Sequence, residues 1–211
     1  MSVPRGMLEG MVSVDLKTTY RDLYRAPRDP VLVTVPARPY LMVDGAGDPN
    51  TAPAYREAVT SLYPLAYALR AAIKDATGTG YAVMPLEGLW WADEVERFRE
   101  LPRSAWRWTM MISLPDDVAQ VDAVEVVART TTARDLPAAV RLEQFGDGEA
   151  VQVLHVGPYT EEAPAVDALH AFVTSSGRSL AGRHHEIYLS DPRRTAPERL
   201  RTIIRQPVAP G

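Results

Sequence analysis

The strongest constraint on the fold is one order of elements that occurs twice along the chain. A strand, a helix and two further strands are predicted in each half, from period-two and helical hydrophobic patterns bounded by turn residues. The first set covers residues 40–43, 53–77, 81–92 and 106–114; the second covers 151–156, 161–176, 183–189 and 201–206. This order indicates a tandem β-α-β-β duplication.

In each predicted unit, one helix packs against one face of a sheet. Two units side by side therefore give an α+β fold, an antiparallel sheet with helices on one face. We expect the ligand cleft at the pseudo-twofold seam between the units, on the sheet face that the helices leave open. A glycine-rich turn, Gly146-Asp147-Gly148, predicts a hairpin between residues 140–145 and 150–156.

The same pattern sets the expected domain boundaries. We predict an N-terminal arm over residues 1–36 and one domain over 37–211. Within that domain we expect repeat one at about 39–114, a linker helix at about 118–133 and repeat two at about 140–206. The arm carries basic residues between aromatic ones and is expected to be ordered.

Composition excludes several classes of function. The chain has no cysteine, which rules out disulfides, thiolate catalysis and Cys-based zinc sites. A net charge of -4 gives no basic surface for nucleic acid, so we expect no nucleic-acid partner. The first eleven residues resemble neither a signal peptide nor a membrane span, so we expect no membrane partner and a cytoplasmic location.

The strand predicted at residues 183–189 has a carboxylate in its middle. Because side chains alternate along a strand, His184, Glu186 and Tyr188 share one face, whereas His185 points to the other. Glu186 is therefore flanked by two ring systems. The alternative is an ordinary solvated glutamate on an exposed strand, since Glu is mostly a surface residue.

Aromatic residues are concentrated in the first half. Tyr55, Val59 and Tyr63 form a stripe on a flank of the predicted helix, and they are either boundary residues or ligand contacts. Trp90 and Trp91 are adjacent on a strand, so one ring must face the core and the other the opposite side. Four tryptophans within 19 positions suit either a large core or a flat ligand.

The histidines do not predict a metal site. His184 and His185 face opposite ways and cannot easily share one ion with His155, so we expect no metal and no cofactor. We interpret His185 as a hydrogen-bonded core residue and His155 as a structural residue at a strand end.

Four motifs in order resemble the GyrI-like small-molecule-binding family, over residues from about 16 to 208. They are Gly45-x-Gly47-Asp48-Pro49-Asn50, Pro85-Leu86-Glu87-Gly88-Leu89-Trp90-Trp91, His155-x-Gly157-Pro158-Tyr159 and His184-His185-Glu186-Ile187-Tyr188-Leu189-Ser190-Asp191-Pro192-Arg193. The resemblance implies binding of an aromatic or hydrophobic, planar small molecule around a glutamate. Some stand-alone members that resemble this chain hydrolyse cyclopropanoid cyclohexadienones, which are reactive DNA-alkylating natural products.

The resemblance also implies roles for particular residues. Glu186 matches the family's ligand-facing acid, and we expect it to orient or deprotonate a water, with Tyr55 or Tyr159 donating a hydrogen bond to the substrate carbonyl. The expected ligand-binding residues are Trp91, Tyr188, His184, Tyr63 and Trp108. Two alternatives remain open: a drug-binding protein without chemistry, and an interaction protein of the gyrase-inhibitor kind. The oligomeric state is also open.

Overall fold

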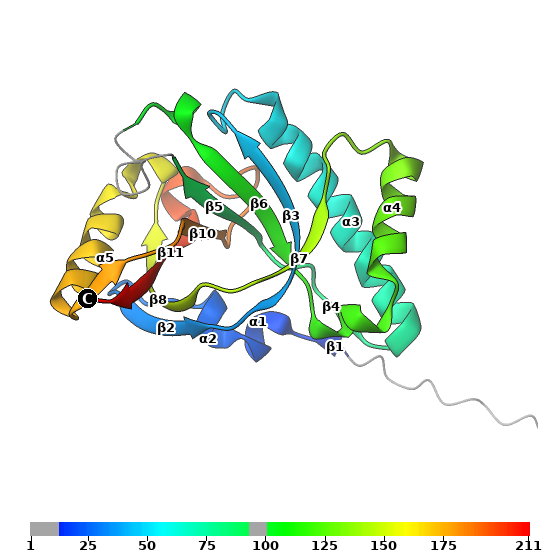
Figure 1. Ribbon diagram of the computed structural model, residues 1–211, viewed down its shortest axis with the longest axis horizontal. Helices are drawn as coiled ribbons and strands as arrows, with labels where there is room; N and C mark the ends of the chain where they lie inside the picture. Colours follow the sequence, from blue (N-terminus) through cyan, green and yellow to red (C-terminus); the bar gives the residue numbers. More distant parts are fainter. Residues whose placement is uncertain (1–12, 93–100) are drawn as a thin grey trace, which may run out of the picture.

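A curled antiparallel sheet forms the centre of the molecule, in a computed structural model that describes residues 13–92 and 101–211 (Figure 1). Nine strands of the described residues build it, in the order β2-β8-β11-β10-β5-β6-β3-β7 with β9 beside β11. The strands of this sheet are β2 (Val31–Val35), β3 (Arg38–Ala46), β5 (Leu86–Trp91), β6 (Arg107–Ser113), β7 (Arg141–Phe145), β8 (Gly148–Val156), β9 (Arg178–Leu180), β10 (His184–Tyr188) and β11 (Arg201–Pro210). Two short strands, β1 (Ser13–Val14) and β4 (Gly80–Tyr81), pair separately.

Six of these strands follow the predicted order in both halves. In the first half β3, the helix α3 (Pro53–Thr77), β5 and β6 follow one another; in the second, β8, α5 (Ala163–Ser175), β10 and β11 do so. Each half contributes three neighbouring strands, and β10 pairs with β5 in antiparallel fashion where the halves meet. The α+β class and the antiparallel sheet are confirmed, whereas the duplication stays a prediction.

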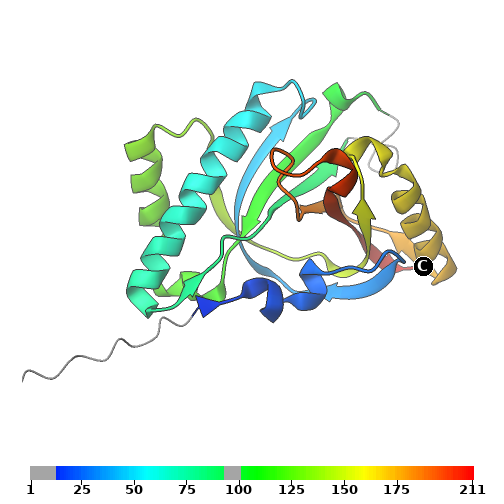
Figure 2. The same cartoon turned by 180° about the vertical axis from the view of Figure 1, so that it is seen from behind.

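Both long helices of these units cover the same sheet face (Figure 2). Helix α3 buries Leu62, Leu65 and Leu69 completely, which is the helical spacing expected of a core-facing stripe. It ends where Gly78 adopts a left-handed conformation, and it continues through Pro64. Helix α5 packs its own apolar stripe against β8 and β11.

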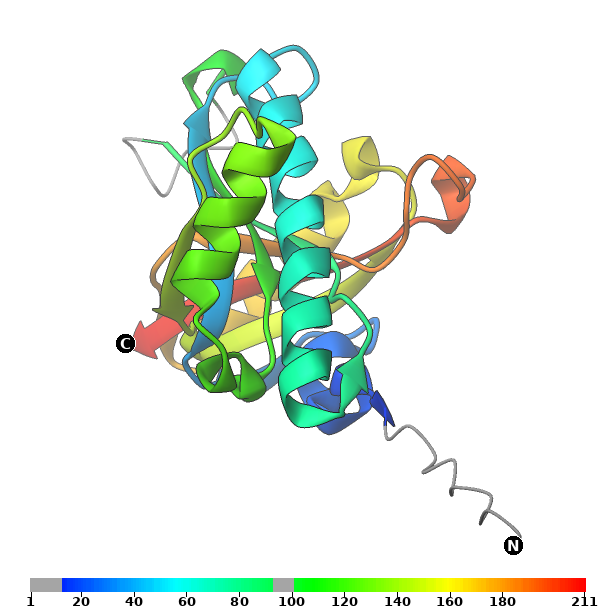
Figure 3. The same ribbon diagram turned by 90° about the vertical axis from the view of Figure 1, so that its right-hand side faces the viewer.

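A linker helix, α4 (Ala123–Arg134), lies along α3 on the outside of the molecule (Figure 3). The 3₁₀ turn η3 (Asp116–Gln120) precedes it, so the helix begins later than the predicted residue 118. Asp122 caps its first turn by accepting a hydrogen bond from the backbone N–H of Glu125. No helix within the described ranges is both long and apolar enough to cross a membrane.

The predicted hairpin at Gly146-Asp147-Gly148 is wrong. Strand β7 pairs with β3 and strand β8 pairs with β11 and β2, so the two strands do not pair with each other. Instead, residues 141–152 run antiparallel to residues 31–42, and the register is the same in the β2–β8 and the β3–β7 pair. A side chain at Gly146 would come within 2.6 Å of the backbone N of Ala37, so glycine is needed where the two segments cross.

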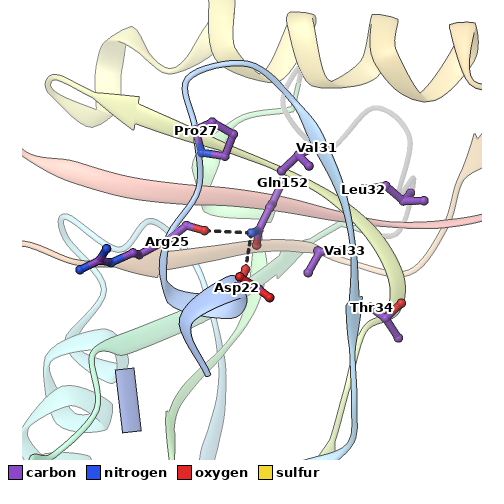
Figure 4. A pocket seen from close by; sticks show the side chains of 8 residues that line it. All are labelled: Asp22, Arg25, Pro27, Val31, Leu32, Val33, Thr34 and Gln152. Carbon is purple, nitrogen blue, oxygen red and sulfur yellow. Dashed lines mark hydrogen bonds between the residues drawn. The ribbon is translucent and has the colours of Figure 1, made fainter. Parts of the chain in front are cut away.

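Residues 22–25 of the N-terminal arm contact the sheet face that lacks the long helices, a face that was expected to be open. Two single-turn helices, α1 (Leu16–Thr19) and α2 (Arg21–Tyr24), bury Leu16, Leu23 and Tyr24. The Gln152 amide donates hydrogen bonds to the carbonyl oxygens of Asp22 and Arg25, at 2.7 and 3.3 Å, beside a cavity of about 500 Å³ (Figure 4). Residues 1–12 of the predicted arm lie outside the described residues, and residues 31–35 of it belong to the sheet.

Under the arm lies a buried cluster of charged groups. The His185 ring is fully buried, with Nδ1 2.7 Å from Asp147 Oδ2 and Nε2 3.0 Å from Glu87 Oε2. Arg205 Nη1 lies 3.5 Å from the same Asp147 oxygen, and the Tyr24 hydroxyl donates to Glu87 at 2.7 Å. The interpretation of His185 as a hydrogen-bonded core histidine is confirmed.

The cluster fixes the charge of His185. Burial alone would lower the pKa of His185, but the charge of Asp147 and the hydrogen bonds to Asp147 and Glu87 raise that pKa above its ordinary value. Burial alone would raise the pKa of Asp147, but His185 and Arg205 bring it below its ordinary value. Because both ring nitrogens face carboxylates, both donate, and the ring is an imidazolium.

This cluster makes stability depend on pH in a defined direction. Below the unfolded-state pKa of about 6.5 the contribution of His185 is fully present, and it is lost as the pH rises through the higher folded-state pKa. Within that window the free energy of unfolding should fall by up to about 1.4 kcal/mol per pH unit, as measured by urea denaturation.

The matched control for this prediction is His170→Gln, on α5 away from the cluster, which should keep the slope. His185→Gln should lose it. If His185→Gln does not fold, a nuclear magnetic resonance titration of the wild-type His185 ring replaces it. An ordinary pKa for that ring would contradict the interpretation.

Candidate functional site

A cavity of about 940 Å³ lies on the helix side of the sheet, where the two units meet. Its walls come from α3, from the 3₁₀ turn η4 (Tyr159–Glu161), from β5 and from β10 with the loop that follows it. That loop lies between α3 and α5 (Figure 2). The cleft is therefore at the predicted seam but on the opposite face of the sheet from the one expected.

Glu186 lies on the cavity floor, in the middle of β10. Its carboxylate is held at both oxygens: the Tyr188 hydroxyl donates to Oε2 at 2.8 Å, and His184 Nε2 lies 3.2 Å from Oε1. The indole N–H of Trp90 donates to the Tyr188 hydroxyl at 3.0 Å. The side chain is 15% exposed, so the carboxylate is oriented by the protein and still reaches the cavity.

Gly88 is the cross-strand partner of Glu186, on β5. A side chain there would lie 2.8 Å from the indole nitrogen of Trp90 and 3.1 Å from the Tyr188 hydroxyl oxygen. Only a residue without Cβ leaves the space that these two groups occupy. Gly88 therefore allows the hydrogen-bonded chain from Trp90 to Glu186 to form.

Tyrosines form the side walls around the carboxylate. Tyr55 comes from α3, and Tyr159 comes from η4, where its ring meets that of Tyr188 edge-on at 5.8 Å. Burial is the main cause that raises the pKa of Tyr159 to about 12, and the negative charge of Glu186 is the second. The same two causes raise the pKa of Tyr55 and of Tyr188 further still. These phenols therefore stay protonated at neutral pH and can act as hydrogen-bond donors.

Two indoles hold the Tyr55 ring in place. The Trp90 ring stacks on it, with 6.2 Å between centroids and 26° between planes, and the Trp108 ring meets it edge-on at 5.5 Å. Trp108 is fully buried and lies outside the cavity lining, so the structure makes it a support for Tyr55 and not the expected ligand contact.

Trp91 points to the other face of the sheet. It packs there with the buried group of Tyr40, Met42, Leu89 and Met111, and the Arg183 guanidinium lies 3.8 Å from its ring centre. The prediction of Trp91 as a cavity wall is therefore corrected to Trp90. Trp106, whose ring meets Trp90 at 5.7 Å, is a second lining residue that the predicted set did not include.

Of the remaining predicted residues, some line the cavity and others do not. Tyr63 lines the cavity one turn beyond Val59 on α3. His184 is buried, and it acts on the site through its contact with Glu186 and not as part of the lining. His155 lies near the end of β8, with Nε2 3.1 Å from the carbonyl oxygen of Pro158. Across residues 13–92 and 101–211, no group of three His, Cys, Asp or Glu side chains could hold a metal ion.

Charged residues also contribute to the lining of the cavity. The lining includes the cations Lys17, Arg103, Arg193 and Arg194 and the acids Glu162 and Asp191. Arg193 and Asp191 pair with each other at 2.9 Å, and both side chains reach solvent. The interior of the cavity therefore combines aromatic walls with one fixed carboxylate and several phenol donors.

This arrangement can bind a flat apolar molecule and act on it. Each carboxylate oxygen has a second lone pair besides the one that accepts from Tyr188 or faces His184, so Glu186 can also accept a proton from a water or a ligand. Tyr55 and Tyr159 can donate to an oxygen at which negative charge develops.

Comparisons with known proteins agree with this fold. Three crystal structures from Listeria innocua each cover 93% of this chain and 100% of their own. One, an uncharacterized conserved protein, has 36% identity and a TM-score of 0.82; two described as hydrolases have 34% and 35% identity, with TM-scores of 0.78 and 0.82. A search of curated proteins found no match. The sequence model of the GyrI-like small molecule binding domain matches residues 28–209, and the chain therefore belongs to that family.

Proposed function

We propose that the protein binds planar hydrophobic molecules in this cavity and hydrolyses reactive cyclopropanoid cyclohexadienones, as a detoxifying enzyme. The observation that carries the proposal is the Glu186 carboxylate, fixed by Tyr188 and His184 within aromatic walls. Two relatives from Listeria innocua with 34–35% identity are described as hydrolases, which supports a hydrolytic reaction.

The reaction adds one water to the strained ring. The water oxygen bonds to the cyclopropane CH₂, the carbon–carbon bond to the dienone ring breaks, and its electron pair moves through the ring to the carbonyl oxygen. Glu186 takes the proton that the water loses. A tyrosine hydroxyl gives a proton to the new phenolate, and solvent returns the proton from Glu186 to the tyrosine.

Tyr55 suits the role of that proton donor better than Tyr159. Its ring is clamped between Trp90 and Trp108, so the hydroxyl is positioned before the substrate arrives. Tyr159 is 37% exposed and forms the outer wall, a position that suits binding of the flat ring system. Of the two tyrosines that the sequence leaves as candidates, we therefore assign this role to Tyr55.

Replacing the carboxylate with an amide tests the base. Glu186→Gln keeps the size of the side chain and its contacts with Tyr188 and His184 but cannot take a proton from water. We expect kcat to fall by about 10²- to 10⁴-fold, the usual contribution of general acid–base catalysis. Formation of the ring-opened phenol is followed by chromatography under single-turnover and steady-state conditions.

Glu149→Gln is the control for this change, because Glu149 pairs with Arg178 away from the cavity. It should leave turnover unchanged. Full activity in Glu186→Gln would sink the proposed base. Saturable binding without any product in the wild type would instead identify a drug-binding protein without chemistry.

Single substitutions to phenylalanine distinguish the roles of Tyr55 and Tyr159. Tyr55→Phe should lower kcat by about 10²-fold or more, the cost of removing one donor to a developing oxyanion. Tyr159→Phe should keep kcat within about threefold, because it changes only an outer wall. In the wild type, kcat should not fall up to about pH 10, since burial keeps the Tyr55 pKa raised. The opposite ranking of the two variants would reverse the assignment.

A further inference from the structure

The outer strands of the sheet differ in charge. Among the described strands, β7 pairs only with β3, and β9 pairs only with β11. Each carries an ion pair. On β7, Arg141 Nε lies 2.6 Å from Glu143 Oε2. On β9, Arg178 Nε lies 2.9 Å from Glu149 Oε2. Strand β2 pairs only with β8, and its residues, Val31–Val35, include no charged side chain. Charges on an outer strand oppose pairing with another molecule, so β2 lacks a protection that β7 and β9 have.

Strand β2 also exposes apolar side chains. Val31 and Leu32 are each 38% exposed, and no other two exposed large apolar residues of the described chain are adjacent in the sequence. Side chains alternate along the strand: Val31 and Val33 lie toward Gln152, whereas Leu32 and Thr34 point away from it (Figure 4). A cavity of about 500 Å³ borders the strand beside the arm. Apolar groups on both sides of β2 therefore reach solvent in a single copy of the chain.

The outward edge of β2 carries backbone groups for a further strand. A strand with one neighbour leaves every second pair of N–H and C=O groups turned away from that neighbour. Pro30 and Pro36 flank the strand, and proline has no N–H to donate. A further strand can therefore pair along the five residues between the two prolines.

The sequence of β2 suits pairing with a second copy of itself. Val-Leu-Val-Thr-Val has valine at its first, third and fifth positions, so it is nearly the same when read in either direction. In an antiparallel pair with a twofold axis at Val33, this residue lies opposite its own counterpart. Leu32 then lies opposite Thr34, and Val31 lies opposite Val35. Branched side chains are favoured in such cross-strand pairs, and no like charges meet. A different protein would find no charge on β2 by which to be selected.

We propose that β2 is the interface of a homodimer, in which two copies pair antiparallel through this strand and their sheets join into one. The interface is isologous, since the same strand serves on both sides. None of residues 31–35 lines the cavity around Glu186, so each copy keeps an accessible site. The dimer is independent of the reaction proposed for that site.

Sedimentation velocity tests the dimer. The chain has a mass of 23.3 kDa, and the dimer has twice that mass. One short strand from each copy gives an interface at the small end of the specific range, below about 1,200 Å², so we expect a dissociation constant of about 1–100 μM. Thr34→Lys places an ammonium group on an exposed side of the strand and should raise that dissociation constant at least about tenfold.

Val124→Lys is the matched control, because Val124 is 70% exposed on α4, away from β2 (Figure 1). It adds the same charge and should leave the dissociation constant unchanged. Circular dichroism checks that both variants are folded. A wild type that stays monomeric up to about 500 μM, or a dimer that Thr34→Lys leaves intact, would overturn the proposal.

A disulfide tests the register independently. The chain has no cysteine, so a single introduced cysteine can link only to its counterpart in another copy. Directly opposite residues of an antiparallel pair have Cβ atoms about 4.5–5.5 Å apart, close to the spacing that a disulfide needs. Val33→Cys should therefore form a covalent dimer under mild oxidation at least about tenfold faster than Val124→Cys. Equal rates for the two variants would reject the twofold pairing at Val33.

Discussion

The antiparallel pairing of β5 with β10 is the constraint on which the rest of the molecule depends. It joins the two halves of the sheet, and its register places Gly88 opposite Glu186. Because neighbouring residues on a strand face opposite ways, the same register puts Glu87 and His185 together on the other face. A shift by one residue would exchange the two faces and destroy both the candidate site and the buried cluster at once.

Burying a single charged group costs free energy, so the number of charged partners in the cluster matters. A charge in a protein interior is tolerated when partners surround it, and removing one partner of a buried pair typically destabilises a protein by about 3–5 kcal/mol. Here Glu87, His185, Asp147 and Arg205 compensate one another. Each comes from a different strand or connection, so the cluster tolerates only one arrangement of these segments. The cluster therefore specifies the course of the chain from β7 to β8 at Asp147 as well as stabilising it.

Local patterns predicted the parts of the fold that depend on nearby residues. The helix over residues 53–77 was predictable because its apolar residues recur at helical spacing and Gly78 ends it. That Glu186 and Tyr188 share a face followed from strand alternation alone. The crossing at Gly146-Asp147-Gly148 was not predictable, because the same three residues suit a tight turn. Its actual course depends on Asp147 reaching His185 and Arg205, which are 38 and 58 positions away.

Whether Trp90 or Trp91 lines the cavity also depends on distant residues, so the local sequence could not predict it. Alternation requires that one of them face the cavity, but only the register between β5 and β10 decides which one. Trp90 pairs with His184 and so shares the face of Glu186. The sequence likewise did not predict that the cavity lies on the sheet face covered by the helices. The arm contacts the other face through Glu87, Gln152 and Arg205, and none of these contacts has a local sequence signature.

The aromatic walls and the carboxylate depend on each other physically. A fixed charge in an apolar cavity needs hydrogen-bond partners, and in this site the partners are themselves wall residues: Tyr188 donates to Glu186 while Trp90 donates to Tyr188. The walls therefore position the acid without filling the space above it. Since Tyr55 is clamped by Trp90 as well, one indole links the carboxylate to the first residue of the stripe along α3. The position of the carboxylate and that of the Tyr55 ring therefore depend on the same indole.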